Sequence, residues 1–143
     1  MSNVIRITPF MIIPDLEVAL TFFVDILGFT LWFKSSGYAY VQRETAAFRL
    51  LEQKDFDASY KHRYAYYIDV KDVDVLYAEL QPKLAALPDH HHHTPTDKPY
   101  GQREIVICAP DGNLLAFGQT PCLAPDTTFV KSDLTEKSPP TAS

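Results

Sequence analysis

The sequence of 143 residues lacks several features that mark common classes of protein. It has only two cysteines, Cys108 and Cys122. Two cysteines favour a reduced, cytoplasmic protein, and a disulfide between them is the less favoured alternative. No apolar run approaches the roughly 20 residues that a membrane-spanning helix needs. The first residues show no basic segment followed by an apolar one, so we expect neither a signal peptide nor a membrane span.

An excess of positive charge is also missing. The formal net charge is −5, which argues against nucleic acids and anionic membranes as partners and mildly favours cationic ligands. The sequence contains no glycine-rich phosphate loop, no Ser-His-Asp order and no Cys-X-X-Cys pair. Nucleotide binding, acyl transfer and thioredoxin-like chemistry therefore gain no support.

The composition is otherwise that of a globular protein, with 46% hydrophobic and 22% charged residues. Eight Tyr, nine Phe and one Trp are a large aromatic content for this length. Aromatic side chains can fill a core or form stacking surfaces, and core packing is the commoner use.

The segment Pro99 to Gln119 predicts a β-hairpin. Residues 103–108 alternate as a strand, with Ile105 and Ile107 on one face and Val106 and Cys108 on the other. The sequence Pro110-Asp111-Gly112-Asn113 is typical of a tight turn, and residues 114–117 form the returning strand. Because an isolated hairpin is unstable in water, the rest of the chain must complete its sheet.

The N-terminal half predicts the order β-α-β-β-β. Residues 4–13 form the first strand, Asp15 caps a helix with apolar residues at helical spacing, and Gly28 ends it. Strands follow at about residues 30–34, 38–42 and 46–52.

The second half repeats this order. Residues 64–70 predict a strand and Asp72 a helix cap, 57 residues (72 − 15) after Asp15. Pro82 should kink or shorten the second helix. One strand of this unit is not visible in the sequence, and we expect it within the polar loop 88–98. The predicted division is a first module at 1–57, a second module at 58–119 and a flexible C-terminal tail at 120–143.

A βαβββ unit that occurs twice, with Asp-Leu-Glu, Phe-Phe and Leu-Gly-Phe early and Tyr-Gly-Gln-Arg-Glu and Pro-Asp-Gly-Asn late, resembles the vicinal oxygen chelate superfamily. This superfamily includes glyoxalase I, extradiol dioxygenases, and fosfomycin- and bleomycin-resistance proteins. The resemblance covers about residues 4–119. It implies an α+β fold in which each module curls its sheet into a cup that holds the ligand.

Most members of this superfamily hold a divalent metal with His, Gln and Glu on inward-facing strand positions. By the shared pattern these positions fall on Thr8, Arg49, Ala65 and Ala116. None of the four offers an imidazole or carboxylate, which are the donors that such a metal requires. We therefore expect no metal and no cofactor.

The chain resembles the bleomycin-resistance proteins best, and these are dimers that sequester their ligand without catalysis. Their groove aromatics fall on Tyr38, Tyr67 and Tyr100, while Asp69 occupies another aromatic position. The resemblance implies a homodimer that binds a small planar or cationic molecule, such as a bleomycin-like ligand. The candidate ligand-binding residues are Trp32, Tyr38, Arg49, Tyr67, Tyr100 and Arg103, and no residue is assigned a catalytic role.

Each candidate also has a structural interpretation. The tyrosines have favourable β propensity, and either Trp32 or the adjacent Phe33 can face the cup. Arg49 lies among apolar residues and needs a partner, either Glu52 or Glu104 or an anionic ligand group. Arg103 and Glu104 are interpreted as strand-edge charges.

The run His90 to His93 is interpreted as a solvated loop, since successive residues point in different directions and form no fixed metal site. His62 has the wrong spacing for a ligand in a continuous strand.

Two other functions remain open. One is a glyoxalase-like lyase, isomerase or dioxygenase with an atypical site, and the other is a module that binds a protein segment in its groove. Bound stoichiometric metal would favour the first, and a protein captured through the groove tyrosines would favour the second.

Overall fold

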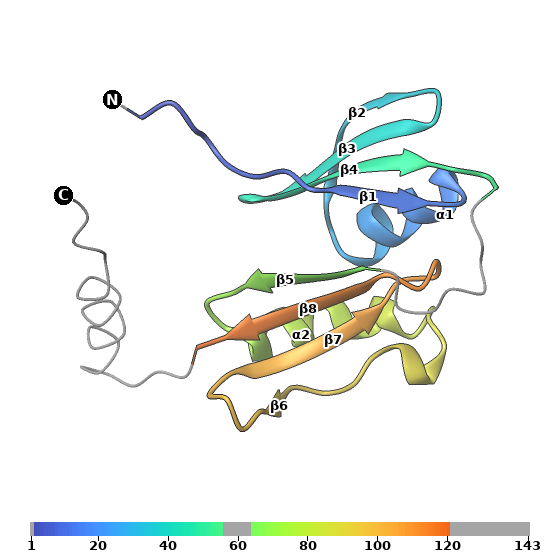
Figure 1. The fold of residues 1–143 in the computed structure, drawn as a ribbon. Coiled ribbons are helices and arrows are strands. Elements are labelled where there is room, and N and C mark those ends of the chain that lie inside the picture. The colour runs from blue at the N-terminus through green and yellow to red at the C-terminus, as the bar shows by residue number, and fades with distance from the viewer. Residues whose placement is uncertain (1, 56–63, 121–143) are drawn as a thin grey trace.

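The computed structural model describes residues 2–55 and 64–120. Two four-stranded sheets make up the fold, and Figure 1 shows one above the other. The first sheet has the order β1-β4-β3-β2 and the second the order β5-β8-β7-β6. In both, the first strand runs parallel to the last and the other pairs are antiparallel. The predicted α+β fold with two βαβββ modules is confirmed. The module boundary at 57/58 and the tail at 121–143 lie outside the described residues.

The first module contains one helical segment and four strands. These are β1 (Phe10–Ile13), α1 (Leu16–Leu20), which continues as the π-helical turn η1 (Thr21–Ile26), β2 (Thr30–Ser35), β3 (Tyr38–Arg43) and β4 (Ala46–Glu52). The Asp15 side chain accepts a hydrogen bond from the Val18 amide, so it caps the helix as predicted. Gly28 adopts φ +77° beyond the helix end, the conformation for which glycine is favoured.

The first strand is shorter than the sequence suggested. We expected it to begin at Val4, but β1 starts at Phe10. Pro9 precedes it, and a proline has no amide hydrogen to donate to the ladder. The segment before β1 therefore runs on without a strand partner (Figure 1). It leaves Val4, Ile5 and Ile7 more than 80% exposed, at 84%, 92% and 86%.

The second module contains β5 (Ala65–Asp69), α2 (Val73–Leu84), the short 3₁₀ turn η2 (Asp89–His91), β6 (Thr96–Asp97), β7 (Arg103–Cys108) and β8 (Leu114–Gln119). The strand that we expected within loop 88–98 is β6. Helix α2 continues two residues past Pro82 instead of ending there. The turn after β7 forms as predicted, with the Gly112 amide donating to the Ala109 carbonyl oxygen at 3.0 Å.

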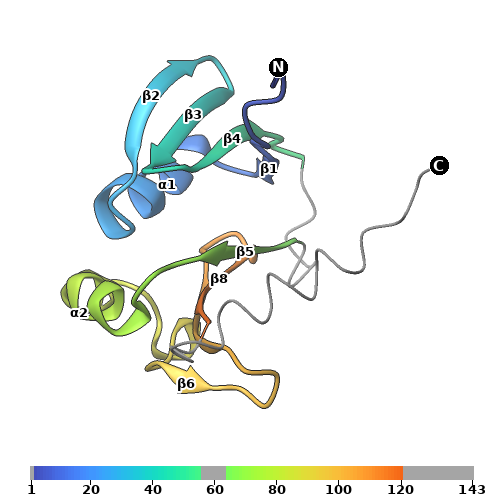
Figure 2. The ribbon, with the colours of Figure 1, turned by 90° about the vertical axis from the view of Figure 1, so that its left-hand side faces the viewer.

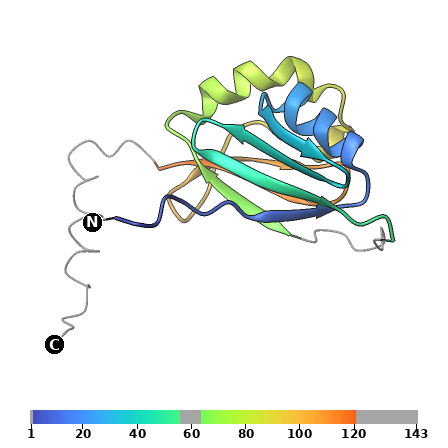
Figure 3. The same ribbon diagram turned by 90° about the horizontal axis from the view of Figure 1, so that it is seen from above.

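One apolar core joins the two modules. It fills the helix side of both sheets, and its largest buried side chains include Phe22, Phe23, Leu50, Leu84 and Ile107. Four phenylalanines of the first module pack ring to ring there, and Phe48 meets Tyr66 of the second module edge-on at 5.1 Å. Much of the aromatic content is therefore core. Seen from above, both helices lie along the same side of the molecule (Figure 3).

Two hydrogen bonds join side chains of the second module to the main chain of β1. The Tyr66 hydroxyl donates to the Phe10 carbonyl oxygen at 2.8 Å, and the Asn113 amide donates to the Ile12 carbonyl oxygen at 3.3 Å. Asn113 is fully buried in the turn before β8. Figure 2, turned by 90° from Figure 1, shows the end of the second sheet where β7 turns into β8 below β1 and β4. None of the described helices is long and apolar enough to cross a membrane.

Candidate functional site

The helices cover one face of each sheet and leave the other open. We name these open faces face A and face B. Face A carries Phe10, Ile12, Phe33, Tyr38, Tyr40, Gln42, Arg49 and Leu51. Face B carries Ala65, Tyr67, Asp69, Thr96, Glu104, Val106, Cys108, Leu114, Ala116 and Gly118. Each face thus combines tyrosines with a charged residue on a central strand.

Glu104 on β7 is the centre of face B. Its side chain is only 3% exposed, and a buried carboxylate is costly unless donors reach it. The Tyr67 hydroxyl donates to Glu104 Oε2 at 2.8 Å. Tyr100 lies near enough for the same carboxylate to raise the pKa of its phenol. Among the described residues no cation pairs with Glu104. Face B therefore holds a buried negative charge under two phenol rings.

Tyr67 reaches Glu104 by crossing an intervening strand. It starts on β5, and its ring passes over Gly118 of β8 to reach β7. A Cβ atom at Gly118 would lie 1.7 Å from the Tyr67 hydroxyl oxygen and 2.3 Å from its Cζ. Only glycine leaves room for this ring, so Gly118 is part of the site although it offers no functional group.

The phenols of face B are held in their neutral form. Burial, followed by the hydrogen bond to Glu104, raises the pKa of Tyr67 well above its ordinary value of 10.0. The hydrogen bond to Glu104 is the main cause that raises the pKa of Tyr100. Tyr67 is 46% exposed and Tyr100 is 65% exposed, so both rings also face solvent. A ligand can therefore stack on them from outside.

These shifts predict a loss of stability in alkali. A tyrosine whose pKa is higher in the folded than in the unfolded protein stabilises the fold fully below pH 10 and less as the pH rises above it. We expect urea midpoints that are constant from pH 7 to 9.5 and fall above pH 10. Tyr67→Phe should make this fall shallower and remove one late-titrating phenol from the absorbance titration at 295 nm. An unchanged titration in Tyr67→Phe would contradict the hydrogen bond to Glu104.

Arg49 on β4 is the centre of face A and is half-buried. Its Nε donates to Thr8 Oγ1 at 2.9 Å and its Nη1 to the Tyr38 hydroxyl at 2.7 Å. The guanidinium lies 5.0 Å from the centre of the Tyr40 ring, within the range of a cation–π contact. Neither Glu52 nor Glu104, the partners considered from sequence, forms an ion pair with it.

The pairing of the edge strand β2 shows which of Trp32 and Phe33 lies on face A. A bulge between Leu31 and Phe33 leaves Trp32 without a strand partner and 67% exposed. Phe33 pairs with Tyr40, and its ring lies 6.1 Å from that of Tyr38. Phe33 and Tyr40 therefore belong to face A. Phe33 was the alternative considered beside Trp32, whereas sequence reasoning missed Tyr40.

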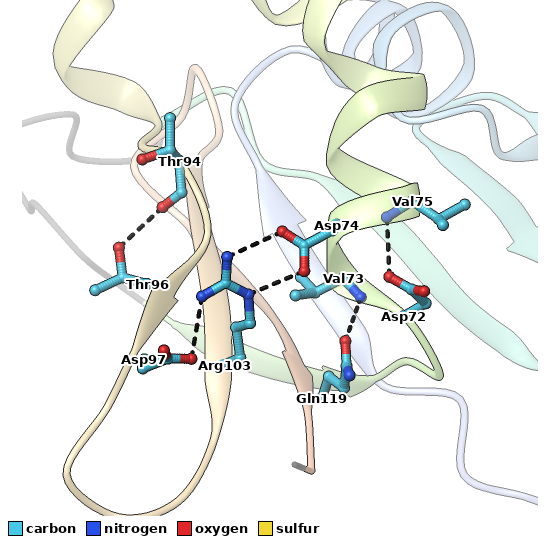
Figure 4. A network of polar contacts seen from close by, with 9 residues as sticks. All are labelled: Asp72, Val73, Asp74, Val75, Thr94, Thr96, Asp97, Arg103 and Gln119. Atoms are coloured by element: carbon cyan, nitrogen blue, oxygen red, sulfur yellow. Dashed lines mark hydrogen bonds and ion pairs between the residues drawn. The ribbon is translucent and has the colours of Figure 1, made fainter. Parts of the chain in front are cut away.

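Arg103 lies on the opposite side of the second sheet from Glu104. It forms two hydrogen bonds with Asp74 at the start of α2, at 2.9 and 3.0 Å, and one with Asp97 of β6 at 3.1 Å (Figure 4). These bonds join β6 and β7 to the helix. The hydrogen bond from Arg103 lowers the pKa of the Asp74 carboxyl, and this effect outweighs the opposing effect of desolvation. The structure does not bring Arg103 together with the other candidate ligand residues.

The histidine run is more ordered than the solvated loop that we expected. His91 Nδ1 lies 3.0 Å from the Cys108 carbonyl oxygen. His93 Nδ1 lies 2.7 Å from the Thr94 carbonyl oxygen, and its Nε2 accepts a hydrogen bond from the Val106 amide at 3.1 Å. Two of the four rings thus support the edge of β7. His62 lies outside the described residues.

A divalent metal does not fit the residues present. Thr8 and Arg49 occupy two of the four positions where the family pattern places ligands, and they bond each other. A guanidinium repels a metal cation, and the alanines at positions 65 and 116 supply no donor. Within residues 2–55 and 64–120 no three His, Cys, Asp or Glu side chains lie close enough to hold a metal ion.

A separate cleft of about 450 Å³ lies between the modules. Its walls are the β3–β4 turn, the β5–α2 connection and the outer face of α2. Arg43 and Glu79 pair across it at 2.7 Å. Neither Arg49 nor Glu104 lines this cleft, and of the residues named for faces A and B it includes only Asp69.

Two βαβββ modules, each with an open sheet face, define a small α+β scaffold. The model of the Glyoxalase/Bleomycin resistance protein/Dioxygenase superfamily matches residues 6–117, and the chain belongs to this family. Among curated proteins, none matches the chain.

Solved structures agree with this assignment. A bleomycin-binding protein from Streptomyces verticillus, complexed with copper(II)-bleomycin, is 25% identical, with a TM-score of 0.66 over 82% of this chain and 97% of that one. A second bleomycin-binding protein complexed with bleomycin is 20% identical, with a TM-score of 0.69 over 82% and 100%. A lactoylglutathione lyase from Agrobacterium tumefaciens is 19% identical, with a TM-score of 0.61 over 85% and 98%. The fold is therefore shared by binding proteins and by an enzyme.

Proposed function

We propose that this chain is a metal-independent, cytoplasmic binding protein of the bleomycin-resistance type. It sequesters a planar or cationic small molecule between aromatic sheet faces. The observation that carries this proposal is the buried Glu104 carboxylate beneath the exposed rings of Tyr67 and Tyr100. The similarity to two bleomycin-binding proteins supports it.

Face B offers a cation two kinds of attraction. A cationic group stacked on a phenol ring gains about 0.5–1 kcal/mol at an exposed site and about 2 kcal/mol when desolvated. Glu104 lies within hydrogen-bond distance of the Tyr67 hydroxyl and close to Tyr100, and it adds its own charge. Two or three aromatic contacts with one such charge are sufficient for micromolar affinity, about −8 kcal/mol.

We propose further that the protein acts as a homodimer in which the open faces of one copy are covered by the other. Face A and the residues around it expose Phe10, Trp32 and Phe33 by more than half. The N-terminal segment adds the exposed residues Val4, Ile5 and Ile7, which lie in a segment without a strand partner. Large exposed apolar surface marks an interaction site in soluble proteins.

The experiment is a titration followed through Trp32, the single tryptophan of the chain. Bleomycin and a panel of planar aromatic cations should give saturable changes in fluorescence at micromolar concentration. Tyr100→Ala should weaken binding several-fold and lower the melting temperature less than Tyr67→Ala does, because the Tyr100 ring is largely exposed. Sedimentation velocity should show two chains per particle.

The outcomes separate this proposal from its rivals. A monomer without saturable binding across the panel would contradict it. Stoichiometric metal, measured on protein lacking His90 to His93, together with turnover of a hemithioacetal or a catechol, would instead establish an enzyme.

A further inference from the structure

Two arginines at face A, Arg49 on β4 and Arg6 in the segment before β1, have no carboxylate partner among the described residues. Within the described residues Arg43 and Arg103 form ion pairs with carboxylates, whereas Arg6 and Arg49 form none. Both unpaired arginines lie around one side chain, Tyr40. Arg6 Nη2 donates to the Tyr40 hydroxyl at 2.8 Å and to Gln42 Oε1 at 3.1 Å, while Arg49 lies against the Tyr40 ring. In a chain of net charge −5, this is a local concentration of positive charge.

The Arg49 guanidinium is held in place but not saturated. A guanidinium has five N–H donors, and the bonds to Thr8 and Tyr38 use two of them, so three remain. Neither of these acceptors carries a negative charge. Nη2 makes no hydrogen bond to any described residue, which leaves it and the second hydrogen of Nη1 for a further acceptor. Such a pair of donors matches two oxygens of a carboxylate or phosphate.

The surroundings of Arg49 favour an anion that is attached to a ring. Half-burial withdraws the guanidinium from water, and an uncompensated charge in that position is unfavourable. The Tyr38 hydroxyl bonds Arg49, and the Phe33 ring lies 6.1 Å from the Tyr38 ring. A flat ring can stack on them while its acidic group reaches Arg49.

We propose that face A is a receptor for an oxyanion, a carboxylate or a phosphate, carried by a planar aromatic ligand. This inference rests on the proposed binding function and names the ligand chemistry of its first cup.

The test compares three probes of equal shape by isothermal titration calorimetry: 2-naphthoate, 2-naphthamide and 2-naphthylmethylammonium. Wild-type protein should bind the naphthoate at least tenfold more tightly than the amide, and added salt should reduce this preference. Arg49→Gln should abolish the preference, and Arg6→Gln should reduce it. Lys34→Gln is the matched control, because it removes the same charge from the opposite face of the same sheet, where Lys34 pairs with Glu17. It should leave the preference unchanged.

Each outcome decides the inference. Arg6 is exposed, so the Arg6→Gln variant should fold. It therefore tests the inference even if the Arg49→Gln variant does not fold. Equal affinity for naphthoate and amide would overturn the oxyanion receptor and leave the binding function standing. If neither binds but the ammonium probe does, the inference likewise fails while face B keeps its role. If none of the three binds, the proposed function fails as well. Loss of the dimer in Arg49→Gln without naphthoate binding in the wild type would show that a carboxylate of a second copy is the counterion.

Discussion

Replacing Gly118 with alanine should lower the free energy of unfolding by about 2–3 kcal/mol, although it adds a single methyl group. The new Cβ would overlap the Tyr67 hydroxyl and ring, at 1.7 and 2.3 Å. The ring must then swing away, and Glu104 loses a donor while it stays buried. Leaving a buried charged group short of a hydrogen bond costs about this much. Urea denaturation measures the change, and the titration at 295 nm should show Tyr67 ionising closer to pH 10.

A double-mutant cycle supplies the control. In Tyr67→Ala the ring is absent, so adding Gly118→Ala to that variant should cost less than about 0.5 kcal/mol, a strongly non-additive result. If Gly118→Ala destabilises both backgrounds equally, the methyl group clashes with something other than Tyr67, and the crossing of β8 by this ring is not what requires the glycine.

Replacing Glu104 with glutamine should weaken binding of 2-naphthylmethylammonium at least tenfold. The amide keeps the shape of the side chain and can still accept the Tyr67 hydrogen bond, but it removes the charge under the rings. Because a buried carboxylate without a cation gains little from its charge in folding, the free energy of unfolding should change by less than about 1 kcal/mol. Calorimetry measures the binding and urea denaturation the stability.

Asp25→Asn is the matched control for Glu104→Gln. Asp25 is an exposed acid on the helical segment of the first module, so it removes the same charge far from face B. It should leave the affinity for the ammonium probe within twofold of the wild type. Equal weakening in both variants would mean that net charge, and not the Glu104 site, attracts the cation.

Local patterns predicted most of the fold. The caps at Asp15 and Asp72, the stop at Gly28 and the turn before Asn113 depend on short-range chemistry, and all form as expected. The strand β6 was expected within loop 88–98, but its position could not be predicted because its two residues are too few to show an alternating pattern. The predicted start of β1 at Val4 was wrong. The β-branched residues before Pro9 favour a strand, but the strand begins only after this proline.

The candidate site was predicted less well, for reasons that particular residues show. Alternation along β7 places Arg103 with Ile105 and Ile107, and Glu104 with Val106, so the sequence already separated Arg103 from the open face. In contrast, nothing in the sequence marks the bulge that turns Phe33 toward Tyr38, because it depends on the pairing of β2 with β3.

The contact between Asn113 and the main chain of β1 spans 101 positions of the sequence. The contacts that bury β1 are therefore complete only after the β7–β8 hairpin has been synthesised. On the ribosome, the first module emerges with the surface that Tyr66 and Asn113 later cover still open to water. Apolar surface exposed during synthesis promotes aggregation and chaperone binding, so newly made chains that stop before β8 are the form of this protein most in need of quality control.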